Sequence, residues 1–164
     1  MKEIYVLRHA KSSWDNSNLS DFDRPLADRG ISDAKKMSNF LKDMNIKIDR
    51  VLCSNAIRAK ETFDLTADGF NFEIDKATYS DKLYFGDTTT IIQDLKELDE
   101  SLNNILIVGH NPTLHYLVEI LTNESINRFT TCNLATISHD GEWISLNSQQ
   151  CSLKSLIRPK ELNN

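Results

Sequence analysis

The sequence predicts a layered α/β domain with a mostly parallel sheet that carries antiparallel strands late in the chain. Short apolar runs typical of strands alternate with longer segments of helical period, and an Asp-Gly pair near the C-terminus is typical of a β-hairpin. The chain has 164 residues, 40% of them apolar, with only five Gly and three Pro. This composition suffices for one core and does not favour disorder, so we expect a single domain over residues 1–164.

The first half of the chain is predicted to contain a strand over residues 4–7, a loop over 11–23, a helix over 28–44, a second strand over 48–53 and a second helix over 56–67. Ser, Asn and Asp recur in the loop, whereas apolar residues recur at helical spacing in the first helix. Asp28 is the expected N-cap of that helix, and Ser54-Asn55 is the expected cap of the second.

The second half is predicted to continue the alternation and to end in a hairpin. We expect an edge strand over residues 70–74, a loop over 83–86, a helix over 88–98, a buried strand over 104–108 and a helix over 113–121. The buried strand is the clearest of these, because its residues form a continuous apolar run. Strands at residues 134–138 and 142–146 flank His139-Asp140-Gly141, which predicts a hairpin.

Charge and cysteine content exclude several classes of protein. The formal net charge of −5 argues against nucleic acid as the partner, because duplex binding depends on neutralised phosphates. No secretory signal is visible at the N-terminus, and no apolar stretch approaches the ~18 residues of a membrane span. Cys53, Cys132 and Cys151 are odd in number and widely spaced, which favours reduced thiols. We expect a cytoplasmic protein with no membrane partner.

Arginines and histidines follow three of the predicted strands. Arg8 and His9 end the first strand, the second leads through Ser54 to Arg58, and His110 follows the buried strand. Ligands of such sheets bind at the carboxyl ends of the strands, so we expect these side chains in one crevice. Two imidazoles and two guanidiniums form an anion site, and phosphate is the expected anion.

These residue types predict phosphoryl transfer. A neutral imidazole is a nucleophile toward phosphorus, so one histidine can accept a phosphoryl group while the other and both arginines stabilise its oxygens. Water then hydrolyses the phosphoenzyme. The cations of the pocket supply the charge that a metal supplies elsewhere, so we expect no metal and no other cofactor.

Three motifs carry a resemblance to a known family. They are Leu7-Arg8-His9-Ala10, Ser54-Asn55-Ala56-Ile57-Arg58-Ala59 with Thr62, and Gly109-His110-Asn111-Pro112. In this order they resemble the histidine phosphatase superfamily, which includes the phosphoglycerate mutases. Asp23-Arg24-Pro25-Leu26 with Gly30, and Phe129-Thr130-Thr131, fit as well, so the resemblance covers most of the chain. The short length and the Arg-Pro-Leu segment indicate its small SixA-like branch, the phosphohistidine phosphatases.

The resemblance implies a three-layer α/β/α sandwich of the phosphoglycerate mutase type, and it assigns roles to the site. His9 is similar to the phosphorylated nucleophile and His110 to the second pocket histidine. Arg8 and Arg58 are similar to the phosphate clamps, and Ser12 is a further candidate donor to phosphate.

The sequence departs from the family pattern at two positions. Ala10 stands where the common signature has glycine, and Asn55 stands where proline usually follows serine. Neither change removes a reacting group. The resemblance leaves open whether Lys11 and Asp15 contact the phosphate.

The general acid is the least defined part of the expected site, and Asp81 and Asp87 are its candidates. Cleavage of a P–N bond expels an imidazole, which needs less acid assistance than an alkoxide, so a phosphoramidate substrate is favoured. The residues between Asp68 and Gly109 leave no room for a large lid, which favours a phosphorylated protein as substrate. The alternatives are a small-molecule phosphomonoesterase and a phosphate-binding module without catalysis.

Other conspicuous residues have simpler interpretations. His115 and His139 lie outside the three motifs and are expected to be structural, and no histidine or cysteine spacing supports a metal site. Trp14 and Tyr84 either line the approach of the substrate or pack in the protein. We expect the protein to be a monomer.

Overall fold

The computed structural model describes residues 1–162 and contains a six-stranded sheet in the order β3-β2-β4-β1-β5-β6. The strands are β1 (Lys2–Arg8), β2 (Arg50–Ser54), β3 (Thr78–Ser80), β4 (Asn104–Gly109), β5 (Leu134–His139) and β6 (Ser152–Ile157). The first four are parallel, whereas β5 is antiparallel to β1 and β6 is antiparallel to β5. The prediction of a mostly parallel sheet with late antiparallel strands is therefore confirmed.

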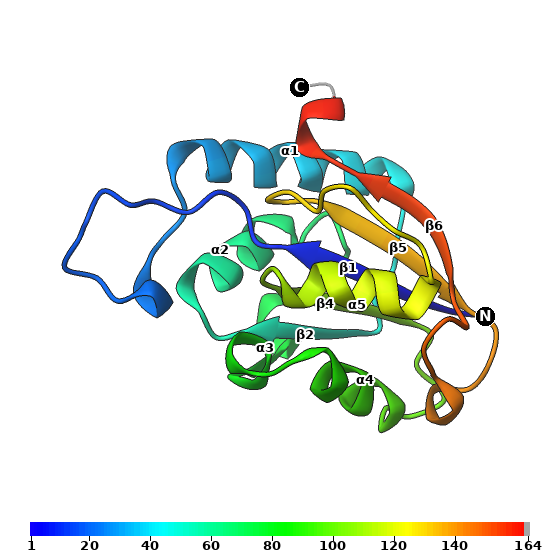
Figure 1. The fold of residues 1–164 in the computed structure, drawn as a ribbon. Coiled ribbons are helices and arrows are strands. Elements are labelled where there is room, and N and C mark those ends of the chain that lie inside the picture. The colour runs from blue at the N-terminus through cyan, green and yellow to red at the C-terminus, as the bar shows by residue number, and fades with distance from the viewer. Residues whose placement is uncertain (163–164) are drawn as a thin grey trace.

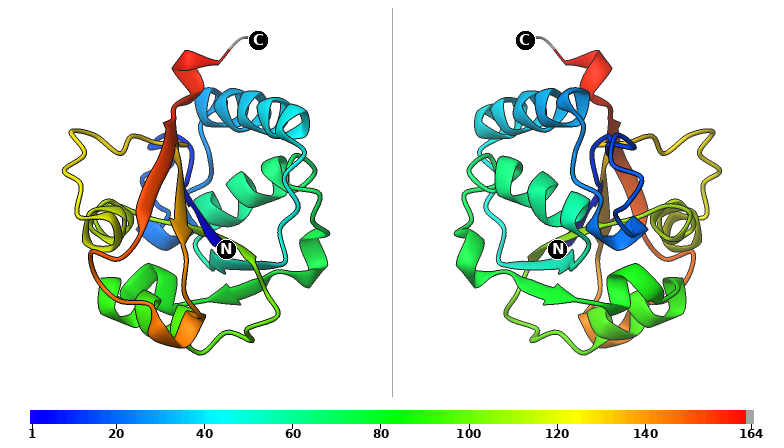
Figure 2. Two further views of the ribbon diagram at one scale, coloured as in Figure 1. Left: turned by 90° about the vertical axis from the view of Figure 1, so that its right-hand side faces the viewer. Right: turned by 90° about the vertical axis from the view of Figure 1, so that its left-hand side faces the viewer.

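Helices cover both faces of the sheet (Figures 1 and 2). They are α1 (Asp28–Met44), α2 (Ile57–Thr66), α3 (Lys82–Phe85), α4 (Thr88–Lys96) and α5 (Thr113–Thr122). Side chains alternate along β1, so Tyr5 and Leu7 pack in one apolar core with α1 and α2. Ile4 and Val6 point to the other face and pack in a second core with α4 and α5. This is the three-layer α/β/α sandwich that the resemblance implied.

The start of α1 differs in detail from its prediction. The helix covers residues 28–44 as predicted, but its N-cap is Ala27, which makes no side-chain cap hydrogen bond, and Asp28 is the first helical residue. The preceding loop fixes this start instead, because the backbone N–H of Ala27 donates to the carbonyl of Lys11 over 2.9 Å. Tertiary contact has replaced the local cap.

The segment between α2 and α4 was predicted wrongly in two places. Residues 70–74 do not form the edge strand, because Phe70 is fully buried in the core with α1 and α2 and Asn71 has a φ of 55°. A left-handed residue interrupts extended backbone. The edge strand is β3. Of residues 83–86, predicted as a loop, the first three belong to the short helix α3 and Gly86 is its C-cap.

The predicted hairpin is also wrong, because β5 pairs with β6 and not with residues 142–146. Residues 143–145 form a 3-10 turn that buries Trp143 completely. The indole N–H of Trp143 donates to the carbonyl of Leu102 over 2.8 Å. Burial of a large aromatic ring with a satisfied N–H outweighs the local preference of Asp140-Gly141 for a tight hairpin.

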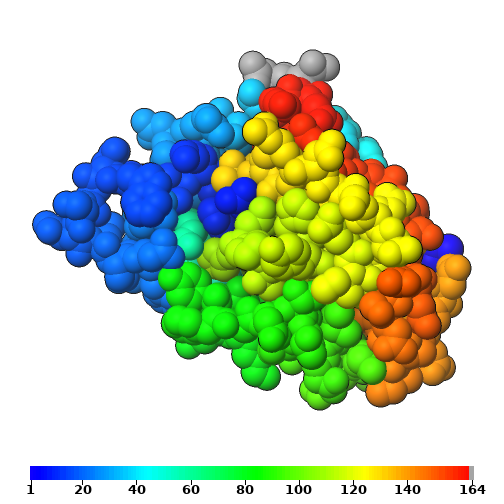
Figure 3. Space-filling model, in the orientation of Figure 1, coloured from blue at the N-terminus to red at the C-terminus, as the bar shows by residue number. Residues whose placement is uncertain are grey.

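The strand order brings the carboxyl ends of β1, β2 and β4 together. Both β1 and β2 are neighbours of β4, with Arg8 level with Gly109 and Cys53 level with Val108. Residues that follow these strands therefore emerge at the same edge of the sheet. The loop between β1 and α1 projects beyond this edge (Figures 1 and 3).

This loop folds back on itself and is held against the start of α1. The N–H of Ser13 donates to the carbonyl of Pro25 over 2.8 Å, and Ser12 forms an isolated bridge with Leu26. Gly30 lies so close to Lys11 that a Cβ atom would collide with the Lys11 backbone. A glycine is required there, and the close contact positions residues 12–25 over the end of the sheet.

The structure also bears on a membrane location and on the state of the cysteines. No helix within residues 1–162 combines the length and apolar character needed to cross a membrane. Cys53, Cys132 and Cys151 are buried and carry free thiols. Burial raises the pKa of Cys151 to about 11 and that of Cys132 to about 12, which keeps both protonated and unreactive at neutral pH.

Candidate active site

A cavity of about 250 Å³ lies at the carboxyl ends of the parallel strands. It is lined by Arg8, His9, Lys11, Ser12, Trp14, Arg24, Arg58, His110, Asn111 and Thr131. The structure thus brings together the two histidines, the two arginines and Ser12 that the sequence singled out. Asp15, Asp81 and Asp87 are not among the lining residues.

His9 has a defined tautomer. Its Nδ1 lies 2.7 Å from the carbonyl oxygen of Ala10. Because a carbonyl can only accept, Nδ1 carries the hydrogen and Nε2 carries the lone pair, to which Nε of Arg58 donates over 3.4 Å. Burial lowers the pKa of His9 to about 3, with further lowering by His110 and the two arginines. His9 is therefore a neutral imidazole at neutral pH, with its unprotonated nitrogen, Nε2, on the side of the ring opposite to Ala10.

His110 is the second imidazole of the cavity. Its ring centroid lies 5.1 Å from that of His9, and its Nε2 lies 2.8 Å from the hydroxyl of Ser54 at the end of β2. Burial, then the charge of Arg58, lowers its pKa to about 4, although Asp21 opposes this shift. Two neutral imidazoles therefore lie side by side in the cavity.

Arg58 connects His9 to the loop after β1. It lies in the first turn of α2, and its Nε is 3.4 Å from His9 Nε2. Its Nη1 donates to the backbone carbonyl of Asp21 over 2.6 Å, and its Nη2 donates to the Asp21 carboxylate over 3.0 Å. These bonds fix the guanidinium beside Nε2 of His9.

Several buried polar atoms of the cavity have no hydrogen-bond partner. Within residues 1–162 they are Nε of Arg8, Nδ1 of His110 and Oδ1 of Asn111, with Nδ2 of Asn133 as the fourth such atom. Arg8 is held in place by a bond from its Nη1 to the carbonyl of Phe129 over 3.1 Å. Buried polar groups are normally paired, so the gathering of unpaired atoms in one cavity indicates a site built for a polar ligand.

Arg24, which lines the cavity, and Asp21, which bonds to the cavity arginines Arg24 and Arg58, were not identified as site residues from the sequence. Arg24 is buried, donates to the carbonyl of Ser13 through Nε and to the hydroxyl of Ser12 through Nη2, and stacks over the Trp14 ring at 3.3 Å. Its Nη1 donates to the Asp21 carboxylate over 2.9 Å. The Asp-Arg-Pro-Leu segment was a signal for Arg24, but its place depends on how the loop folds back.

The other predicted residues have different surroundings. Asp87 is the N-cap of α4 and accepts from the backbone N–H of Thr90. Asp81 accepts from the amide of Asn55 over 2.9 Å. His115 and His139 pair with backbone carbonyls away from the cavity. The ring of Tyr84 packs edge-on against His110 at 5.3 Å.

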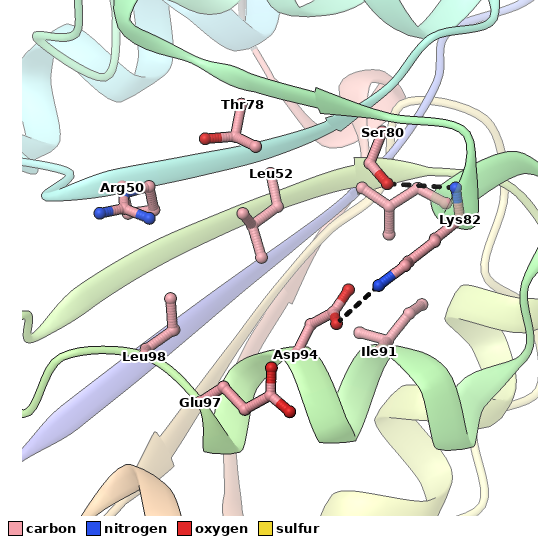
Figure 4. A pocket seen from close by; sticks show the side chains of 10 residues that line it. Arg50, Leu52, Thr78, Ser80, Lys82, Ile91, Asp94, Glu97 and Leu98 are labelled. Carbon is pink, nitrogen blue, oxygen red and sulfur yellow. Dashed lines mark hydrogen bonds and ion pairs between the residues drawn. The ribbon is translucent and has the colours of Figure 1, made fainter.

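A second cavity, of about 320 Å³, lies between α4 and the edge of the sheet (Figure 4). Its floor includes Leu52 and Leu98, and its rim carries both signs of charge, with Lys82 3.6 Å from Asp94. No histidine lines it. Of these two cavities, only the one at the strand ends is lined by imidazoles together with three guanidinium groups.

The low pKa values of the two cavity histidines predict a pH dependence of stability. Folded His9 and His110 titrate at about 3 and about 4, below the ordinary value of 6.5. Between pH 6.5 and pH 4 the unfolded chain therefore binds more protons, so the free energy of unfolding falls as the pH falls. We expect a loss of about 2 kcal/mol for each histidine between pH 7 and pH 5, measured by urea denaturation. The His9→Gln/His110→Gln variant should show a flatter profile, and equal slopes would contradict the buried neutral state.

Comparisons with known proteins agree with this geometry. The family model of the histidine phosphatase superfamily (branch 1) matches residues 4–88. An uncharacterized protein of Mycobacterium leprae is 31% identical over 94% of this chain and 100% of its own length. The phosphohistidine phosphatase SixA of Escherichia coli is 29% identical over 84% of this chain and 86% of its own.

Solved structures match as well. The structure of the protein histidine phosphatase SixA complexed with tungstate superposes with a TM-score of 0.85 and 29% identity, over 98% of this chain and 99% of that one. Membership of one family therefore explains the three motifs, the sheet order and the cavity at the strand ends. The chain belongs to the histidine phosphatase superfamily.

Proposed function

We propose that this protein is a phosphohistidine phosphatase that acts through a phosphorylated His9. The observation that carries the proposal is the fixed tautomer of His9, which keeps the lone pair on Nε2, where it accepts a hydrogen bond from the guanidinium of Arg58. The similarity to SixA supports the substrate class. The proposed partner is accordingly a protein that bears a phosphorylated histidine.

In the first step, His9 Nε2 attacks phosphorus and the P–N bond to the substrate ring breaks. The electron pair of that bond stays on the leaving ring. Arg8 and Arg58 carry fixed positive charge and donate to the equatorial oxygens of the phosphoryl group, and His110 adds a further nitrogen beside them. The cations of this chain thus supply the electrostatic stabilisation for the transfer.

In the second step, water attacks phosphorus and the P–N bond to His9 breaks. The Nδ1–H of His9 remains bonded to the Ala10 carbonyl, so His9 leaves phosphorus as a neutral imidazole. The tautomer of His9 is unchanged throughout, and release of inorganic phosphate regenerates the starting site. One hydrogen of the attacking water stays on its oxygen as P–OH, the other passes to a phosphate oxygen or to solvent, and no redox change takes place.

The surroundings of the cavity support a macromolecular substrate. The segment from Asp68 to Gly109 is used by β3, α3, α4 and β4. Trp14, which lines the cavity, and Phe85, whose ring packs against that of Tyr84, are 70% and 77% exposed. An open cavity with exposed aromatic side chains nearby suits a phosphoryl group presented on a protein surface. We also propose that residues 1–164 act as one domain, since the sheet draws strands from both ends of the chain.

The small-molecule phosphomonoesterase is the second candidate function, and a substrate comparison with and without chelator separates the two. We expect a phosphohistidine peptide to be turned over with a higher kcat/KM than p-nitrophenyl phosphate or a sugar phosphate, and EDTA to leave all rates unchanged. A preference for the sugar phosphate would favour the second candidate. Loss of activity in EDTA would contradict a pocket that relies on its own cations, and no turnover of any substrate would indicate a phosphate-binding module.

A further inference from the structure

Asp21 is a carboxylate that bonds to two of the arginines that line the cavity, Arg24 and Arg58. It opens the short 3-10 turn Asp21–Asp23 in the loop after β1, and its side chain is 49% exposed. Its carboxylate accepts from Nη1 of Arg24, from Nη2 of Arg58 and from the hydroxyl of Tyr84 over 2.6 Å. Since the same Arg58 guanidinium touches His9 Nε2, only one guanidinium separates Asp21 from the nucleophile.

Asp21 cannot serve as an ordinary general acid. The hydrogen bond from Tyr84, followed by those from Arg24 and Arg58, lowers its pKa to about 2. It is therefore ionised at neutral pH and has no proton to donate. An ionised carboxylate has about four acceptor positions, of which three side chains use three here, so it can accept one more hydrogen bond.

The chemistry of a phosphorylated imidazole calls for an acceptor of this kind. When the P–N bond breaks, the electron pair stays on the ring nitrogen that held phosphorus. If the distal ring nitrogen carries a hydrogen, the ring leaves as neutral imidazole, whereas without that hydrogen it must leave as an imidazolide anion. Assistance is therefore needed at the distal nitrogen, away from the scissile bond, which differs from a phosphoester whose leaving oxygen itself takes the proton.

The site already contains this arrangement for its own histidine. The distal nitrogen of His9 is Nδ1, and its hydrogen is bonded to the Ala10 carbonyl. His9 is thus held in the form in which it can leave phosphorus as neutral imidazole in the second step. In an in-line transfer the substrate ring departs on the side of phosphorus opposite to His9.

We propose that Asp21 accepts a hydrogen bond from the distal ring N–H of the substrate phosphohistidine and so stabilises the protonated leaving ring. This proposal rests on the proposed function. It makes Asp21 a catalytic residue that favours phosphoramidates over phosphoesters, because a phosphoester has no distal N–H to donate. It also assigns the leaving-group role to a residue outside the pair Asp81 and Asp87.

The experiment replaces Asp21 with asparagine, which keeps the size and one acceptor oxygen but removes the charge. Turnover of N-phosphoimidazole is compared with that of p-nitrophenyl phosphate, whose leaving group needs no such assistance. We expect the ratio of the two kcat values to fall by about 10- to 100-fold, the range for a lost charge-assisted hydrogen bond. The Asp21→Glu variant keeps the charge and should recover part of this ratio.

A pH profile separates catalysis from mere positioning of Arg24 and Arg58. A nearby carboxylate favours the protonated ring of the bound substrate, so Asp21→Asn should move the basic limb of kcat for N-phosphoimidazole down by about one pH unit. Asp23→Asn is the matched control, because Asp23 lies in the same turn but accepts from Ser20 and not from a cavity arginine.

The outcomes test the role of Asp21 separately from the proposed phosphohistidine phosphatase function. An equal fall in kcat for both substrates, with no shift of the basic limb, would overturn the role of Asp21 and leave the proposed function standing. The same holds if Asp23→Asn changes the ratio as much as Asp21→Asn does. If the wild-type protein fails to hydrolyse N-phosphoimidazole and phosphohistidine peptide, both the proposed function and the role of Asp21 are rejected.

Discussion

Replacement of His9 by alanine should abolish both phosphoenzyme formation and turnover, with a loss of at least about 10⁴-fold in kcat. The change removes the nitrogen that forms the covalent bond to phosphorus. Among the residues lining the cavity, His110 is the other imidazole, but its Nε2 is engaged with Ser54. It is therefore not expected to replace His9 as nucleophile.

The measurement uses a substrate labelled in its phosphoryl group and a rapid quench in base. Wild-type protein should yield a phosphoprotein that is stable in base and labile in acid, as expected for phosphohistidine, and His9→Ala should yield none. His115→Ala is the matched control, because His115 bonds to the Ile126 carbonyl outside the cavity. It should retain the label. Turnover that survives in His9→Ala would rule out the covalent mechanism.

The central residues of the site could be predicted because they follow buried strands directly. Apolar runs identify β1 and β4 in the sequence, and the ends of parallel strands meet at one edge of a sheet. The positions of Arg8, His9 and His110 thus depend on local pattern plus one general rule of topology. Arg58 follows in the same way, since it lies in the first turn of the helix after β2.

Asp21 and Arg24 could not be placed by the same reasoning. They lie in a loop whose course depends on contacts that are distant in sequence, such as that of Gly30 with Lys11 and those of Asp21 with Arg58 and Tyr84. Hydrophobic period carries no information about such contacts. The sequence predicted that residues 11–23 form a loop, but the positions of Asp21 and Arg24 depend on the path that the loop follows.

The late strands illustrate a different limit. The Asp140-Gly141 pair was a sound local signal for a turn, yet the partner of β5 is β6, which the sequence analysis did not identify. In β6, Leu153 and Leu156 pack against the core of the α4 and α5 face. Burial of Trp143 removes residues 143–145 from strand pairing, and this competition between two nearby apolar segments is settled only by tertiary packing.

The net charge of −5 takes on a different meaning once the site is known. Arg8, Arg24 and Arg58 all line one cavity, whereas Asp21 and Asp23 are exposed residues of the loop between β1 and α1. Reactivity depends on the local potential, whereas the net charge is an average over the molecule. A cationic cavity in an acidic surface admits one phosphoryl group and offers little to a polyanion.

Replacement of Arg58 by glutamine should lower kcat/KM by about 10²- to 10³-fold for phosphohistidine peptide and p-nitrophenyl phosphate alike, the usual cost of one preorganised donor to a developing charge. Arg58 supplies a fixed positive charge next to His9 Nε2, and glutamine keeps a donor but not the charge. Arg58→Lys should recover only part of the loss, because lysine lacks the planar fork that bonds to His9 and Asp21 together.

The control for charge is Lys82→Gln, since Lys82 pairs with Asp94 beside the second cavity and is exposed. Steady-state kinetics of the three variants, with calorimetric binding of inorganic phosphate, make the comparison. Arg58→Gln should weaken phosphate binding, and Lys82→Gln should not. If Arg58→Gln retained kcat/KM to within about threefold, a difference below 1 kcal/mol, the guanidinium would hold Asp21 in place without stabilising the transferred phosphoryl group.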